Sequence, residues 1–140
     1  MMQKLSLPLV GLSVLVCCFG CGDPKYFPVT GIVVDEQGKP FTELNGATVV
    51  FEAVEQSSSA VGEVQADGTF SMSSETADDG CVPGKQRVAI GLVFGDGDGP
   101  QVRVVDPQYD TVKTSELTVD IEKKHNHIRL QLKRFAPQAE

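Results

Sequence analysis

Two short clusters in the sequence carry side chains that could hold a metal ion. His125 and His127 lie two residues apart, so in an extended strand their rings would project from the same face. Asp96 and Asp98 place two carboxylates at the spacing used by calcium-binding loops. Imidazole nitrogens suit transition metals and carboxylate oxygens suit calcium, so the two clusters indicate different ions.

The residues around both clusters argue against a bound metal. Arg129 and Gln131 continue the histidine face with a cation and an amide, whereas metal binding needs neutral imidazoles. The turn at 96–99 lacks the third acid and the distal Glu of a complete calcium loop. We therefore predict no metal and no cofactor. The clusters remain only as weak candidate metal ligands: Asp96, Asp98, His125 and His127.

No catalytic constellation is apparent elsewhere in the chain. It contains neither a G-x-S-x-G elbow nor a Gly-rich phosphate loop, and its acids are too dispersed to infer a paired general acid and base. The formal charge is −7 and the sequence pI is about 4.8, so the surface repels phosphate backbones. We expect neither an enzyme nor a nucleic-acid-binding protein.

The amino terminus carries the most specific signal. Lys4 precedes the apolar run 5–16, which is too short to span a bilayer comfortably, and Gly20-Cys21 follows. This pattern resembles a bacterial lipoprotein signal peptide. In that family the Cys after the cleavage site receives the lipid and becomes the mature amino terminus. The resemblance implies lipid attachment at Cys21 and an extracytoplasmic protein anchored to a bacterial cell membrane.

Alternatives to Cys21 remain open at this stage. The lipobox prefers Leu three residues before the lipidated Cys, where this chain has Cys18. Cleavage before Cys18 would place Leu15 there but leave Cys17 where a small residue is wanted. An ordinary secretory signal cut near Gly20 is the next alternative, and a plain membrane helix is the third.

Processing at Cys21 would leave Cys81 without an intramolecular partner. Free cysteine is among the most buried residue types and behaves as a small hydrophobe. The sequence next to Cys81 has no His or Lys cluster that would lower the pKa of a thiol. We predict a packed, inert side chain.

Short apolar runs separated by Gly and Pro predict an all-β domain. Seven strands are expected, at residues 29–34, 48–54, 60–65, 69–73, 85–94, 117–121 and 128–132. The turn at 35–40 predicts an opening hairpin, and Asp67-Gly68 predicts a second hairpin between the third and fourth strands. Seven strands at this spacing favour an antiparallel sandwich of two sheets, transthyretin-like or Ig-like.

The order of these motifs resembles a known family. V-T-G-I-V-V-D-E-Q-G-K-P, T-V-V-F, D-G-T-F and D-G-C-V-P-G-K-Q-R-V-A-I follow one another as in carboxypeptidase regulatory-like domains. The match is closest to the small lipoproteins of planctomycete-type bacteria, and it extends from Val29 to about Leu132. It implies a transthyretin-like sandwich without catalysis. Gln86 departs from the group, which tends to carry an aromatic residue nearby, and Cys81 stands where a small apolar residue is usual.

The sequence thus predicts a signal peptide at 1–20, a tether at 21–28, a β-sandwich domain at 29–133 and a C-terminal tail at 134–140. The long stretch 95–106 is expected to be an interaction loop. Its charged residues are Asp96, Asp98, Arg103 and Asp106. The leading function is a lipid-anchored structural or protein-interaction module at the cell envelope. The alternative is a small-ligand or carbohydrate-binding lipoprotein that uses loops at one end of the sandwich.

Overall fold

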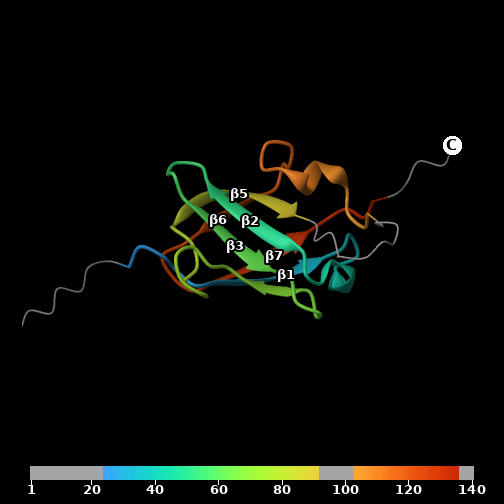
Figure 1. The fold of residues 1–140 in the computed structure, drawn as a ribbon, viewed down its shortest axis with the longest axis horizontal. Coiled ribbons are helices and arrows are strands. Elements are labelled where there is room, and N and C mark those ends of the chain that lie inside the picture. The colour runs from blue at the N-terminus through green and yellow to red at the C-terminus, as the bar shows by residue number, and fades with distance from the viewer. Residues whose placement is uncertain (1–23, 92–102, 136–140) are drawn as a thin grey trace, which may run out of the picture.

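The computed structural model describes residues 24–91 and 103–135, which fold into a sandwich of two β-sheets (Figure 1). The smaller sheet has the order β4 (Thr69–Ser71), β1 (Val29–Val34), β7 (Asn126–Gln131). The larger sheet has the order β3 (Ser59–Glu63), β2 (Thr48–Ala53), β5 (Gly84–Gly91), β6 (Thr118–Ile121). Two 3-10 helices, η1 (Thr42–Leu44) and η2 (Pro107–Asp110), lie in connections. The predicted all-β, seven-stranded sandwich is confirmed.

The core lies between the sheets and follows the alternation of each strand. Val49, Phe51 and Ala53 of β2 are buried, as the sequence predicts, and so are Val88 and Ile90 of β5. Their strand neighbours on the outer face are mostly polar or half-buried. Alternation therefore identifies the buried face of these strands correctly.

The strand pairing differs from the prediction in one respect. β1 and β7 run parallel, from the pair Val29–Asn126 to the pair Val34–Gln131, whereas the other four strand pairs are antiparallel. The prediction of a wholly antiparallel sandwich is wrong for this pair. The connection 122–125 carries the chain from β6 across to the other sheet, so β7 arrives beside β1 with the same direction.

The two predicted hairpins contain the predicted turns but not the predicted pairing. The turn after β1 folds back on itself, with the Phe41 N–H donating to Val33 O at 2.8 Å, and η1 then leads the chain to the other sheet. β3 and β4 also belong to different sheets, and in place of a ladder one bridge joins Val61 of β3 to Ser73, two residues beyond β4. Turn residues thus predict where the chain reverses. They do not predict whether the next strand stays in the same sheet or crosses to the facing one.

A buried asparagine fixes the crossing between β6 and β7. Asn126 is 5% exposed, and its Oδ1 accepts from the Glu122 N–H at 2.9 Å. Its Nδ2 donates to the carbonyl oxygens of Glu122 and Lys124 at 3.0 and 2.7 Å. The amide satisfies backbone groups that would otherwise be unpaired where the chain leaves one sheet for the other.

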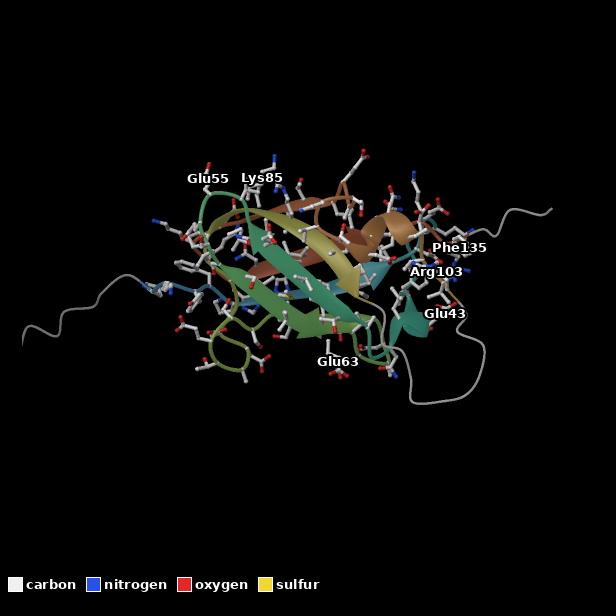
Figure 2. All side chains as sticks on the ribbon, turned by 45° about the horizontal axis from the view of Figure 1, so that its top comes forward. Glu43, Glu55, Glu63, Lys85, Arg103 and Phe135 are labelled. Atoms are coloured by element: carbon white, nitrogen blue, oxygen red, sulfur yellow. The ribbon has the colours of Figure 1, made fainter. Side chains whose placement is uncertain are left out.

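The two ends of the sandwich can be distinguished by the residues that lie at each of them. The described chain begins at Pro24, at what we call the proximal end, where Glu55 and Lys85 also lie (Figures 1 and 2). Glu43, Arg103 and Phe135 lie at the opposite, distal end (Figure 2). Within 24–91 and 103–135, no helix is long and apolar enough to cross a membrane.

Two glycines allow close packing, Gly62 where β3 approaches β4 and Gly31 within the smaller sheet. A Cβ at Gly62 of β3 would lie 2.6 Å from Ser71 O, at the end of β4, and 2.9 Å from Sδ of Met72, the next residue. A Cβ at Gly31 of β1 would collide with the Phe70 ring and with the backbone of β7. Neither glycine is required for a positive φ, so both are required for close packing.

Substitution of Gly62 by Ala should therefore destabilise the fold. We expect the free energy of unfolding to fall by about 1–3 kcal/mol, because the added methyl group is forced against backbone that cannot move aside. The measurement is denaturant unfolding followed by circular dichroism. Gly91→Ala is the matched control, since its Cβ would lie 3.6 Å from Thr48 Cβ, an ordinary contact. Equal stabilities of the two variants would contradict this account of the seam.

Candidate functional site

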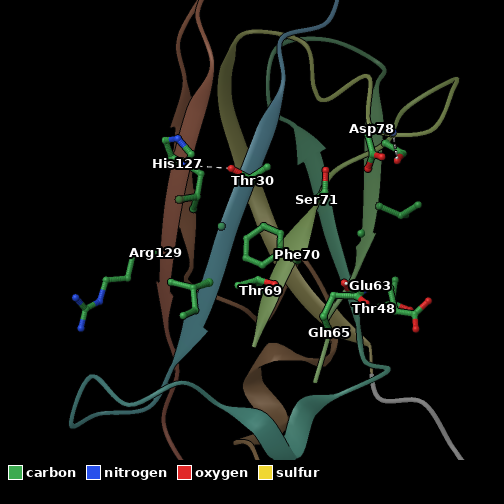
Figure 3. Close-up of a pocket in the computed structure, with 16 residues that line it drawn as sticks. Thr30, Thr48, Glu63, Gln65, Thr69, Phe70, Ser71, Asp78, His127 and Arg129 are labelled. Carbon is green, nitrogen blue, oxygen red and sulfur yellow. Dashed lines mark hydrogen bonds between the residues drawn. The ribbon is translucent and has the colours of Figure 1, made fainter. Parts of the chain in front are cut away.

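An open groove of about 1000 Å³ lies on the surface of the described residues (Figure 3). It crosses the outer face of the smaller sheet and continues onto the edge strand β3 of the larger one. Its lining includes Thr30, Ile32, Thr48, Val61, Glu63, Gln65, Thr69, Phe70, Ser71, Asp78, His127 and Arg129. Sequence reasoning placed binding in the long loop and overlooked this surface.

The register of the smaller sheet arranges the groove side chains in two rows. Thr30 of β1 is paired with His127 of β7 on one side and with Ser71 of β4 on the other. Ile32 is likewise paired with Arg129 and with Thr69. Because paired residues share a face of the sheet, each row presents its side chains together on the outer surface. The result is a surface of hydroxyl groups with an imidazole and a guanidinium along one margin.

At the other margin of the groove, the backbone of Ser71 lies beside β3, with its carbonyl oxygen packed against Gly62. Met72 N–H donates to Val29 O and Val33 N–H donates to Gly68 O, which directs the N–H and C=O of Ser71 away from β1. On that side the ladder with β3 stops at the Val61–Ser73 bridge. Val61 itself is 50% exposed. The seam thus places the backbone of Ser71, directed away from β1, next to an exposed apolar side chain.

The two histidines lie together, as their spacing predicts. Their ring centroids are 4.6 Å apart and their planes are inclined by 23°. Both rings contact the same hydroxyl, with Thr30 Oγ1 3.3 Å from His125 Nε2 and 2.9 Å from His127 Nδ1. Thr30 was not predicted to be part of this cluster, because its position depends on the pairing of β1 with β7.

The acidic residues and the arginine of the predicted interaction loop do not form a common site in the described residues. Asp96 and Asp98 lie outside the described residues. Arg103 forms a two-pronged ion pair with Asp110, at 2.9 and 3.0 Å. The Asp106 carboxylate accepts from the Gln108 N–H at the start of η2. The described part of the predicted interaction loop is thus occupied by local bonds.

Clusters of three or more metal-ligating residues are absent from the described parts of the chain, counting His, Cys, Asp and Glu. Within those parts, His125 and His127 are therefore not joined by a third ligand of these types. Cys21 precedes the first described residue, so lipid attachment remains a prediction.

The Cys81 side chain is packed in the core, as predicted. It is 1% exposed, and burial, together with the nearby Asp79 carboxylate, raises the pKa of its thiol to about 12. A thiol with this pKa is protonated at neutral pH and is a poor nucleophile. Its backbone forms a bridge with Phe27, which ties the chain leading into β1 to the sandwich.

Gln86, which departs from the family pattern, is also buried. It is 1% exposed, and its Nε2 donates to Val82 O at 3.0 Å. Its polar group thus finds a backbone partner in the segment that leads into β5, so burial leaves no unpaired amide at this position. A phenylalanine at this position could not make this bond.

A charged cluster stabilises the distal end. Asp35 is 3% exposed, and its carboxylate accepts from the backbone N–H groups of Gln37 and Lys39 and from Arg134 Nη2 at 3.2 Å. Arg134 also pairs with Glu43 at 3.0 Å and lies over the Phe41 ring at 4.5 Å from its centroid. The cluster joins the turn after β1 to the segment that follows β7.

Burial alone would raise the pKa of Asp35, but its hydrogen bonds outweigh this effect. Two backbone N–H donors and the Arg134 guanidinium stabilise the ionised carboxylate, so its pKa lies below the ordinary value. A carboxylate with a lowered pKa stabilises the folded state above the ordinary pKa of about 4. That contribution is lost as the pH falls through the lower, folded value.

Comparisons with known proteins give little further guidance. No family model matches the chain, and no curated protein matches it. Among solved structures, it is similar to a DUF3823 family protein from Parabacteroides merdae, at 19% sequence identity and a TM-score of 0.45. The match covers 80% of this chain and 48% of that protein, so this chain spans about half of its length. A likeness this distant carries no argument about function.

The Asp35 cluster makes stability dependent on pH. Wild-type protein should lose thermal stability steeply between pH 5 and pH 2, and Asp35→Asn should lose less over the same range because it has no carboxylate to protonate. At pH 7 the variant should melt at a lower temperature than wild type. The measurement is the melting temperature at several pH values. Asp120→Asn, which removes an exposed carboxylate of β6, is the control, and an Asp35→Asn profile parallel to it would refute the assignment.

Proposed function

We propose that this protein is a lipid-anchored, non-catalytic binding module of the bacterial cell envelope. The groove across β7, β1, β4 and β3 is the observation that carries the proposal. Its volume of about 1000 Å³ reaches the upper part of the range for ligand-binding clefts. The resemblance to carboxypeptidase regulatory-like domains, which accompany enzymes or stand alone without catalysis, supports the same role.

The arrangement of groove side chains supports binding rather than catalysis. The Thr30 hydroxyl and His127 Nδ1 lie at the 2.9 Å spacing of a nucleophile and its base. A working pair also needs a group that orients the base and donors for a developing oxyanion. The other contact of this hydroxyl is a second imidazole, His125, and the imidazoles are exposed to water. This constellation does not prepare Thr30 for attack.

An extended segment of an envelope protein suits the groove better than a glycan. Phe70, the aromatic residue in its lining, is 3% exposed and offers a sugar ring little surface for stacking. The N–H of Ser71, which points away from β1, is instead the kind of group with which a polypeptide pairs at a sheet edge. Val61, half exposed beside it, provides an apolar contact for a side chain of such a segment.

The anchor is proposed from the Gly20-Cys21 junction that follows the apolar run. In the described structure the chain is directed to the proximal end, because Phe27 is bonded to Cys81 and Pro24 lies beyond it (Figure 1). A lipid at Cys21 would hold the sandwich by this end. The distal end and the outer faces of both sheets would then be accessible to other envelope components.

Lipidation is tested by metabolic labelling in a bacterial host. Wild-type protein should incorporate labelled fatty acid and partition into detergent, and Cys21→Ala should do neither, because the acceptor thiol is absent. Cys18→Ala is the matched control and should be labelled like wild type. Labelling that is lost in Cys18→Ala and retained in Cys21→Ala would move the attachment site, and labelling of neither wild type nor variants would remove the anchor.

The groove is tested by photo-crosslinking in intact cells. A photoreactive residue at Val61 should give a discrete crosslinked band, because its side chain lines the groove and is half exposed. The same residue at Arg87, exposed on β5 and absent from the groove lining, is the control. The band from Val61 should weaken severalfold when Ser71→Pro removes the N–H that faces the groove. Identical bands from both positions would contradict a binding groove.

A further inference from the structure

We propose that His125, His127 and Thr30 form a binding site for a first-row divalent metal ion, with copper(II) bound most tightly. Two imidazole nitrogens are directed at a single point, the Thr30 hydroxyl, at 3.3 and 2.9 Å. Imidazole suits zinc, copper and nickel, and copper(II) is the strongest of the divalent series for a given set of ligands. The inference does not depend on the groove having a protein partner.

The contacts of the Thr30 hydroxyl show that the two ring nitrogens point toward the same atom. A threonine hydroxyl has one hydrogen, so it can donate to one ring and must accept from the other. Both nitrogens therefore lie on the same side of the stacked pair, 4.6 Å apart between centroids. A metal ion held at this point would take both nitrogens as ligands, with the Thr30 hydroxyl oxygen beside them.

The cation that argued against a metal in the sequence lies elsewhere in the structure. Arg129 follows His127 on the same face of β7, but its guanidinium packs against the turn after β1. The Arg129 Nη2 lies so close to Gly38 that a Cβ added at this glycine would be only 2.6 Å from it. Figure 3 shows Arg129 pointing away from His127 and Thr30. Lys124, next to His125 in the chain, is paired with Glu122 at 2.7 Å.

The site is accessible and needs little rearrangement. Both histidines are exposed, so small rotations of their side chains can close the nitrogens around an ion. The backbone beneath them is fixed, because Thr30 and His127 are a register pair of the parallel β1–β7 ladder. Two nitrogens and one hydroxyl oxygen leave further coordination positions for water or for a group in the adjoining groove. The structure thus assigns an open, surface metal site.

The test is titration of the full-length protein with copper(II) in detergent, after its accessible thiols have been alkylated. The chain contains two histidines, so any imidazole signal in electron paramagnetic resonance comes from this pair. Wild-type protein should bind one copper(II) with two nitrogen ligands. His125→Ala and His127→Ala should each lose one of these nitrogens and weaken binding by at least about tenfold.

Two further variants separate a metal site from a general change in the fold. Thr30→Val keeps the shape of the side chain and both histidines, and it should weaken binding several times while retaining the two-nitrogen signal. Thr118→Val, an exposed position on β6, should bind like wild type. The proposal is overturned if wild-type protein gives no imidazole signal, or if the double variant lacking both histidines binds copper(II) as tightly as wild type.

Discussion

The close approach of the two sheets along the β3–β4 seam is the constraint on which the rest of the structure depends. Phe70 covers Gly31 within its own sheet and meets Phe51 of the other sheet edge to face, with centroids 6.4 Å apart. Gly62 allows the backbone of β4 to pass directly beneath β3. Because β4 turns under β3 there, their ladder is limited to the Val61–Ser73 bridge, and the groove forms where it stops. The packing that closes the core therefore also creates the candidate binding surface.

The positions of the strands could be predicted from the sequence, but their partners could not. Alternation of apolar residues places each strand and its buried face to within about two residues, where the structure describes it. It does not distinguish a strand that returns in the same sheet from one that crosses to the facing sheet, since both need the same buried side chains. The turn after β1 and the Asp67-Gly68 turn both exist, yet each leads to a crossing. The parallel β1–β7 pair joins segments almost a hundred residues apart, beyond the reach of any local signal.

The same limit applies to the site. The spacing of His125 and His127 on one strand predicts a shared face, and their stacked rings follow from it. Thr30, which both rings contact, can be found only from the register of β1 against β7. The charge of Arg129 was read correctly from the sequence, but the direction of its long side chain depends on the turn at Gly38. Burial of Cys81 was predictable because a small thiol without a cationic neighbour behaves as a hydrophobe.

The parallel pairing of β1 and β7 also fixes where the proposed sites lie relative to the proposed anchor. Both strands begin at the proximal end, so His125 and Thr30 lie near the end at which the described chain starts (Figure 1). A chain held by lipid at Cys21 has few residues before Phe27 is bonded to Cys81, and fully extended they span only about 20 Å. The metal site would then lie close to the membrane surface, and the Asp35–Arg134 cluster would face away from it. A soluble partner would reach the distal end first, whereas a partner that is itself embedded in the membrane would meet the histidine margin of the groove.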